Sequence, residues 1–215
     1  MQPIDETAAK LLQNWCQHHE LPFPDTAIER TALYLDRLLH YQHQTNLTGF
    51  SSPEDIIRNL FIDSLQILRT RKIHGPLLDV GTGAGFPAIP IKIVCPEMEM
   101  ILVEPRTKRY AFLRLIEREL GLEHLQIYKA KIESAPVPDL LGTAISKALM
   151  PIPDWASLAR PWARNGAKIA CMISQADWQV FQRDLHSLDY AVSSIIEDGD
   201  RIYLLLEYDR NTAFR

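Results

Sequence analysis

The sequence contains few cysteines and no long apolar run. Its three cysteines, Cys16, Cys95 and Cys171, are odd in number, far apart and placed within apolar segments. This argues against a disulfide framework and predicts buried thiols in a reducing compartment. No run of about 18 apolar residues occurs, so no membrane span is expected. The opening residues, MQPIDETAAK, carry acids where a signal peptide has a basic and then an apolar stretch, which predicts a cytoplasmic protein.

Positive charge is also scarce. The 23 lysines and arginines are outnumbered by 27 acidic residues, and the net charge of −4 at pH 7 argues against a protein that coats nucleic acid without specificity. The segment 105–114, PRTKRYAFLR, is a local exception, because it contains Arg106, Lys108, Arg109 and Arg114 and no acid. A confined basic surface is therefore compatible with the composition.

Spacing typical of metal ligands is absent as well. The seven histidines include a pair at helical spacing, His40 and His43, without a cysteine or carboxylate partner in the same turn. A single zinc-type site there is an alternative, but polar surface histidines fit the pattern better. No metal is expected.

What the sequence does contain is, first, a helical N-terminal third. Apolar residues recur at helical spacing over residues 4–20 and 25–44. A third helix is predicted to begin at SPED, with Ser52 as its N-cap and Asp55 completing a capping box, and to end near Arg71.

From residue 76 onward, strands alternate with helices. Strands are predicted near 77–80, 99–104, 125–130, 142–146 and 167–173. Helices are predicted near 87–95, 107–120, 154–164 and 176–187, and Gly121 has the position of a helix C-cap glycine. Such alternation predicts a parallel sheet with right-handed crossovers.

The C-terminal end breaks this alternation. The segment 190–208, YAVSSIIEDGDRIYLLLEY, consists of two strand-like runs around Asp198-Gly199, which is a hairpin signal. A parallel α/β sheet closed by an antiparallel hairpin is the plan of the seven-stranded methyltransferases, and it is not the usual plan of a dehydrogenase.

A glycine loop follows the first strand. Gly81, Gly83 and Gly85 permit positive φ angles and allow a ligand to approach the backbone closely. The spacing is G-x-G-x-G, whereas a dinucleotide fingerprint is G-x-G-x-x-G and would have its third glycine where this chain has Phe86. Pro87 removes an amide that a phosphate would use. The loop therefore suits a ligand without a diphosphate, which argues against a nicotinamide dehydrogenase.

Two acids flank this loop in the predicted sheet. Asp79 precedes Gly81 by two residues and can face a ligand's ammonium group, and Glu104 ends the second strand, in ILVEP, where a carboxylate accepts both hydroxyls of a ribose. An ordinary turn beside an unrelated surface acid is the alternative. Loop, acid and terminal hairpin together favour a ligand with adenosine, an amino-acid tail and no phosphate, which describes S-adenosyl-L-methionine.

Several segments of the chain resemble those of one known protein family. The loop segment DVGTGAGFPAIP resembles that of the glucose-inhibited division protein B family, whose members methylate N7 of a guanine in small-subunit ribosomal RNA. The tail GFPAIP after the first glycines is the most specific part. Four further segments occur in the order that the family has: NLTGF, SPEDIIRNLFIDSL, TKRYAFLR and GTAISKA.

This resemblance implies a class I methyltransferase. The expected fold is α/β, with a Rossmann-like seven-stranded sheet and an antiparallel C-terminal hairpin in residues 74–215, preceded by a helical extension in residues 1–73. The resemblance also implies cofactor contacts at Gly81, Phe86, the pair Ile132-Glu133 and Lys147. The whole set expected at the cofactor is Asp79, Gly81, Thr82, Gly83, Gly85, Phe86, Glu104, Ile132, Glu133 and Lys147.

The expected RNA contacts are mainly basic. Arg114 and Arg118 lie opposite the apolar face of the predicted helix 107–120, and the alternative is a solvated face balanced by Glu117 and Glu119. The candidates for RNA binding are Asn46, Arg106, Lys108, Arg109, Arg114 and Lys147.

The chain also departs from the family's pattern. Asn59-Leu60 stand where the family has arginine and histidine, Lys147 stands where it has arginine, and its lysine-glycine after the fifth strand is missing. These departures keep two alternatives open: a non-catalytic RNA- or ribosome-binding protein that retains the fold, and a methyltransferase with another substrate, such as a small molecule.

The leading hypothesis is methyl transfer from S-adenosyl-L-methionine to N7 of a guanine in 16S (small-subunit) ribosomal RNA. N7 carries a lone pair and no proton, so the reaction needs no general base, and no catalytic acid or base is assigned. The expected partner is 16S ribosomal RNA or the small ribosomal subunit, and the expected protein is a monomer without metal.

Overall fold

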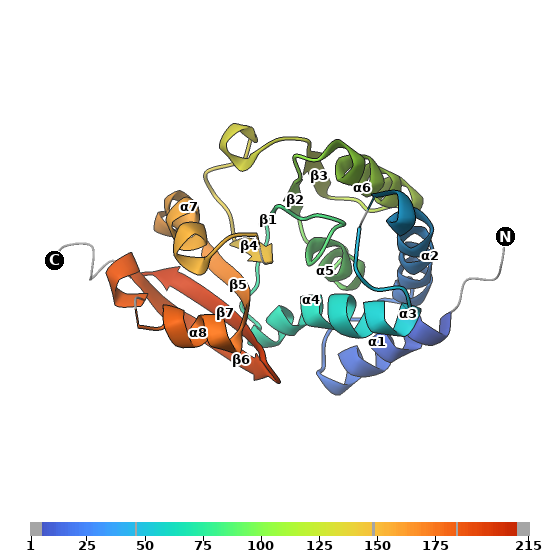
Figure 1. Ribbon diagram of the computed structural model, residues 1–215, viewed down its shortest axis with the longest axis horizontal. Helices are drawn as coiled ribbons and strands as arrows, with labels where there is room; N and C mark the ends of the chain where they lie inside the picture. Colours follow the sequence, from blue (N-terminus) through green and yellow to red (C-terminus); the bar gives the residue numbers. More distant parts are fainter. Residues whose placement is uncertain (1–5, 46, 148, 184, 210–215) are drawn as a thin grey trace.

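The computed structural model describes residues 6–45, 47–147, 149–183 and 185–209 (Figure 1). Within these ranges seven strands form one sheet in the order β3-β2-β1-β4-β5-β7-β6. The strands are β1 (Leu77–Val80), β2 (Met100–Val103), β3 (Leu125–Tyr128), β4 (Thr143–Lys147), β5 (Lys168–Ser174), β6 (Tyr190–Asp198) and β7 (Arg201–Tyr208). The first five are parallel, and β7 is antiparallel to both β5 and β6. The predicted parallel sheet with a terminal hairpin is confirmed.

The helices also lie close to their predicted positions. The N-terminal part contains α1 (Glu6–His18), α2 (Ala27–Thr45) and a continuous helical run made of α3 (Pro53–Ile56), the π-helix η1 (Ile57–Ile62), α4 (Asp63–Leu65) and the 3-10 helix η2 (Gln66–Thr70). The sheet is accompanied by α5 (Ala88–Val94), α6 (Thr107–Glu119), η3 (Ile132–Ser134), α7 (Ile152–Arg164), α8 (Gln175–Phe181) and η4 (Leu185–Leu188).

The predicted helix ends have physical counterparts. Ser52 Oγ accepts a hydrogen bond from the Asp55 backbone amide at 3.1 Å, which caps α3. Gly121 has a φ of 57° and follows the end of α6, as a C-cap glycine does.

Two boundaries differ from the predictions. The helix predicted over 176–187 ends at Phe181 and is followed by the separate turn η4, because no glycine or proline marks that end in the sequence and periodicity alone extends it too far. The hairpin turn consists of Gly199 and Asp200, since Asp198 still pairs with Arg201.

Helices cover both faces of the sheet (Figure 1). One face packs against α1, α2, the run 53–70, α5 and α6, and the other packs against α7 and α8. Each face has its own hydrophobic cluster, and alternating strand residues point to opposite faces. Leu77 packs in the cluster under the N-terminal helices, whereas Leu78 packs in the cluster under α7 and α8. The N-terminal helices thus share a hydrophobic core with the sheet, and the division at residue 73 stays a prediction. No helix in the described ranges has the length and apolarity required to cross a membrane.

A buried polar network joins the helical run to two strands. The Asp63 carboxylate forms an ion pair with the Lys147 ammonium at the end of β4. Its Oδ1 accepts a hydrogen bond of 2.6 Å from the Tyr203 hydroxyl on β7. Since Tyr203 and Asp63 are both buried, this network fixes the helical run over the carboxyl ends of the strands.

We predict that Asp63→Asn lowers the free energy of unfolding by about 3 kcal/mol, because the Lys147 ammonium loses its anion in a mostly buried position. Tyr203→Phe removes one hydroxyl donor and should cost about 1.5 kcal/mol. Urea unfolding with unchanged m-values measures both. A loss from Asp63→Asn no larger than that from Tyr203→Phe would contradict the assignment of the ion pair as the main constraint.

Candidate functional site

The glycine loop lies where the order of the strands reverses. After β1 the chain continues to β2 on one side, while β4 pairs with β1 on the other side. In open parallel sheets such a switch point forms a crevice at the carboxyl ends of the strands. Gly81, Gly83 and Gly85 line this edge with φ angles of 70°, 64° and 107°. The predicted need for positive φ is confirmed.

The three glycines differ in what surrounds them. A Cβ at Gly85 would collide with the side chain of Ile89, and one at Gly81 would lie 2.6 Å from Cδ1 of Leu149. At Gly83 the nearest side-chain atom would be Nη1 of Arg109, at 3.6 Å. A Cβ would therefore clash with a side chain at Gly81 and at Gly85, whereas at Gly83 it would meet only ordinary van der Waals contacts.

The carboxylate of Asp79, at the end of β1, stabilises the glycine loop through hydrogen bonds. Its buried carboxylate accepts hydrogen bonds through Oδ2 from the Thr82 hydroxyl at 2.6 Å and from the Ala88 amide at 3.2 Å. Burial raises the pKa of Asp79 to about 7, although these two bonds and the charge of Lys147 act in the opposite direction. Oδ1 is buried and receives no donor from the described residues. The carboxylate thus has an unused acceptor at the base of the loop.

Glu104 connects the second strand to the loop. Its Oε2 accepts a hydrogen bond from the Gly83 amide at 3.0 Å, and its Oε1 accepts one from the Arg106 amide at 2.8 Å. The buried carboxylate thus lies beside Gly83, where an added Cβ would meet no clash. Each oxygen has a further lone pair, so a ribose diol can still donate to this carboxylate.

The structure brings Asp79, Thr82, Gly83 and Glu104 together through hydrogen bonds. The acceptor oxygens of these two carboxylates, one of which is buried and unused, fit a ligand with hydroxyl and ammonium donors that lies along the loop backbone. The residues thus fit the cofactor predicted from the sequence.

Other predicted residues face elsewhere. The Phe86 ring stacks on Tyr34, with ring centroids 5.5 Å apart, so any contact of Phe86 with a ligand would come from its backbone. Ile132 is half-buried against the core of the second sheet face, while Glu133 is exposed in the same 3-10 turn. Lys147 is directed to Asp63.

The basic candidates for RNA binding form an exposed group on and before α6. Arg106, Lys108 and Arg114 are exposed, and Arg109 lies beside Gly83. Arg114 pairs with Glu117 at 2.6 Å, and Glu119 pairs with Arg37 of α2. Asn46 lies outside the described residues.

The structure also shows the surroundings of two positions that depart from the family's pattern. Asn59 is exposed and donates to the Asp55 carbonyl at 2.9 Å, and Leu60 packs against the core. Among the described residues, no three His, Cys, Asp or Glu side chains gather as a metal site requires.

Two contacts of the loop were missed by sequence reasoning. Tyr34 of α2 is buried, and its hydroxyl donates to the Ala84 carbonyl at 2.6 Å. Leu149, beyond the end of β4, contacts Gly81. Both side chains occur at positions that look apolar and ordinary in the sequence, so no local pattern identified them.

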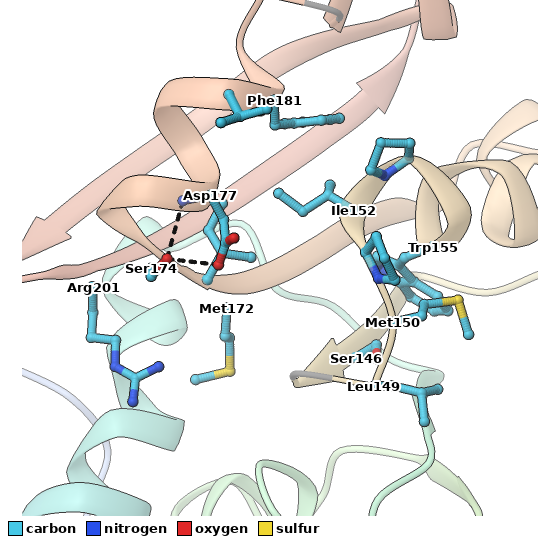
Figure 2. Close-up of a pocket in the computed structure, with 14 residues that line it drawn as sticks. Ser146, Leu149, Met150, Ile152, Trp155, Met172, Ser174, Asp177, Phe181 and Arg201 are labelled. Atoms are coloured by element: carbon cyan, nitrogen blue, oxygen red, sulfur yellow. Dashed lines mark hydrogen bonds between the residues drawn. The ribbon is translucent and has the colours of Figure 1, made fainter.

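A pocket of about 580 Å³ extends from this site along the ends of β4 and β5 (Figure 2). Leu149 lines it and contacts Gly81 on its other side, so the pocket and the glycine loop are neighbours. Sequence reasoning missed this pocket too, because its lining comes from several separate segments.

Comparisons with known proteins agree with this geometry. The GidB family model, described as rRNA small subunit methyltransferase G, matches residues 27–198. Ribosomal RNA small subunit methyltransferase G of Desulfitobacterium hafniense is 38% identical over 161 residues, which are 72% of this chain and 66% of that protein. The protein of the same name in Helicobacter hepaticus is 36% identical over 144 residues, covering 66% of this chain and 77% of its own length. The chain thus spans about two thirds of the first of these relatives.

Among solved structures, the glycopeptide N-methyltransferase MtfA complexed with (S)-adenosyl-L-methionine matches with a TM-score of 0.56 at 12% identity, covering 69% of this chain and 86% of that one. At this identity the likeness concerns the fold alone. The predicted class I methyltransferase fold is confirmed by it together with the strand order.

The raised pKa of Asp79 predicts a pH dependence of stability. Between its ordinary pKa of 3.8 and about 7, the carboxyl is ionised in the unfolded chain but protonated in the folded one. Unfolding then releases a proton, so the free energy of unfolding falls as pH rises through this window. Asp79→Asn should remove this contribution, and urea unfolding at a series of pH values measures the difference in slope.

A matched control is Asp25→Asn, which changes an exposed acid and should keep the slope of the wild type. Equal slopes for the wild type and Asp79→Asn would show that the Asp79 carboxyl ionises normally in the folded protein.

Proposed function

The chain belongs to the rRNA small subunit methyltransferase G family, and on that premise we propose that it transfers a methyl group from S-adenosyl-L-methionine to N7 of a guanine in 16S (small-subunit) ribosomal RNA. The observation that supports the cofactor assignment is the buried Glu104 carboxylate, which accepts from the Gly83 amide at the switch point of the sheet. The relatives' names and the family model support the RNA substrate.

The cofactor would be held by groups from three segments. Glu104 would accept the ribose hydroxyls, the backbone of Gly81 and Gly83 would border the amino-acid tail, and the unused Oδ1 of Asp79 would accept from its ammonium group. The Ile132 amide would meet the adenine edge, with Glu133 supporting that turn. When bound, the cofactor supplies a sulfonium methyl: the N7 lone pair forms the new bond while the carbon–sulfur bond breaks and its electron pair stays on sulfur.

The protein's own residues then have a limited task. No proton moves, so a general base is unnecessary, and the site must align N7 with the methyl carbon and exclude water. Positive charge passes to the purine during transfer, and nearby carboxylates stabilise it better than cations do. The ion pair with Asp63 neutralises Lys147, which lies at this edge of the sheet.

The RNA backbone would follow the basic group on α6. Arg109 lies beside the glycine loop, and the exposed Arg106, Lys108 and Arg114 lie before and along the same helix, where phosphate contacts would position the substrate without reading its sequence. The proposal further includes a monomeric protein without metal, acting in the cytoplasm on 16S ribosomal RNA or on the small ribosomal subunit.

The test is transfer of tritiated methyl groups to small ribosomal subunits and to naked 16S ribosomal RNA that lack the modification. We expect incorporation at one guanine, recognised as N7-methylguanine by borohydride reduction and aniline cleavage. Binding of S-adenosyl-L-homocysteine without RNA methylation would overturn the proposed reaction, and transfer to other cell components would then identify another substrate.

Gly83→Val should abolish both cofactor binding in calorimetry and methyl transfer, because the side chain would project from the loop backbone into the proposed place of the amino-acid tail, and no protein atom would clash with its Cβ. Gly121→Val is the matched control. Its φ of 57° is close to the 64° of Gly83, no atom lies within 4 Å of its Cβ position, and it is at the end of α6. Equal loss of binding in both variants would mean that backbone strain, and not a filled cofactor site, is responsible.

A further inference from the structure

The pocket beside the glycine loop is formed by the segment after β4, the end of β5, and α8 (Figure 2). Its volume of about 580 Å³ lies in the range typical of small-molecule sites. None of the residues predicted to bind the cofactor lines it, but Leu149, which does line it, contacts Gly81. A ligand in the pocket and a ligand on the loop would therefore be neighbours beside Leu149.

Apolar side chains form most of the walls of the pocket, and several of them are buried. Trp155 is 2% exposed, and its Nε1 donates to the Ala170 carbonyl at 3.2 Å, which fixes the plane of the indole ring. Met172 and Phe181 are buried on the opposite elements, β5 and α8. Walls of this kind suit a flat, weakly hydrated ring better than a phosphate or a sugar.

Two charged side chains, Asp177 and Arg201, also line the pocket, and both residues are exposed. Figure 2 shows Asp177 on the inner side of α8, opposite the segment that carries Ile152. Ser174 Oγ donates to Asp177 Oδ2 at 2.6 Å and accepts from the Asp177 amide at 3.1 Å, so the carboxylate has a defined orientation. No donor of the described residues reaches Oδ1 in the hydrogen bonds of the structure. The pocket thus offers a pre-oriented acceptor.

Guanine has the complementary donors. Its N1–H and its N2 amino group lie side by side on one edge and can donate together to a carboxylate, whereas adenine has an acceptor at N1. N7 lies on the far side of the purine from this edge. A guanine bonded to Asp177 can therefore turn N7 toward Leu149 and the glycine loop.

Resting on the proposed function, we propose that this pocket receives the target guanine, and that Asp177 is the residue that selects it by accepting hydrogen bonds from N1–H and the N2 amino group. Trp155 and Met172 would lie on either side of the space that the guanine ring occupies. Methylation at N7 makes the purine cationic and its N1–H more acidic, so the bond to Asp177 strengthens as charge develops. The same contact would therefore select guanine over other bases and increase the rate of methyl transfer.

The test compares guanine with inosine, which keeps N7 and N1–H but lacks the N2 amino group. The wild-type protein is first used to identify the guanine that it methylates. The same RNA is then assembled by ligation with inosine at that position. We expect kcat/KM of the wild type to fall about tenfold or more on inosine, the effect of one lost hydrogen bond to a charged acceptor. Asp177→Asn should lose at least tenfold on guanine and show almost no preference between the two bases.

Two variants make the result specific. Asp154→Asn changes an exposed acid in the first turn of α7 that does not line the pocket, and it should keep the wild-type preference. Asp177→Glu keeps the carboxylate and should restore part of the preference, which a merely structural role would not do. Binding of S-adenosyl-L-homocysteine should be unchanged in all variants.

Retention of the full guanine preference by Asp177→Asn would overturn this inference and leave the proposed function intact. If the wild type marks no guanine at all while binding the cofactor product, the proposed function fails, and the assignment of the pocket fails with it.

Discussion

The buried carboxylate of Asp79 is the constraint from which the site is built. It bonds the Thr82 hydroxyl and the Ala88 amide with one oxygen, and so ties the end of β1 to the start of α5. The chain between them must turn sharply, which the positive φ angles of the glycines allow. The Gly83 amide is thereby directed to Glu104 on β2. Burying this carboxylate costs stability, as its raised pKa indicates, and the result is a loop with a defined shape.

The N-terminal helices belong to the same construction. Tyr34 of α2 supports the loop through the Ala84 carbonyl, and its ring lies against Phe86. Asp63 of the helical run holds Lys147 at the end of β4. Lysine makes this contact as a point charge, whereas an arginine can form two parallel bonds. One oxygen of Asp63 is sufficient for the ammonium, and the other accepts from Tyr203, so lysine at this position is compatible with the observed network.

Much of the fold could be predicted because strands and helices impose different periods on the sequence, and because Ser52 and Gly121 mark helix ends chemically. The glycine loop and its two acids were predictable for a similar reason, since their positions follow from strand ends. Tyr34, Leu149 and the pocket were not, because each depends on which segments meet in three dimensions. The sequence also did not decide whether the basic face of α6 binds RNA or is a solvated face with its charges balanced. The pairing of Arg114 with Glu117 shows why, because the same face carries exposed cations and acidic partners for them.

The distribution of charge around the site follows the course of the proposed reaction. Asp79 and Glu104 lie where the cationic cofactor would bind, and Asp177 lies in the pocket where the purine would become cationic. Lys147, at the end of β4, is neutralised by Asp63. Positive charge would thus move from one acidic group to another. Because electrostatic stabilisation is largest for groups already oriented before reaction, the bonds that hold these carboxylates in place have the same importance as the carboxylates themselves.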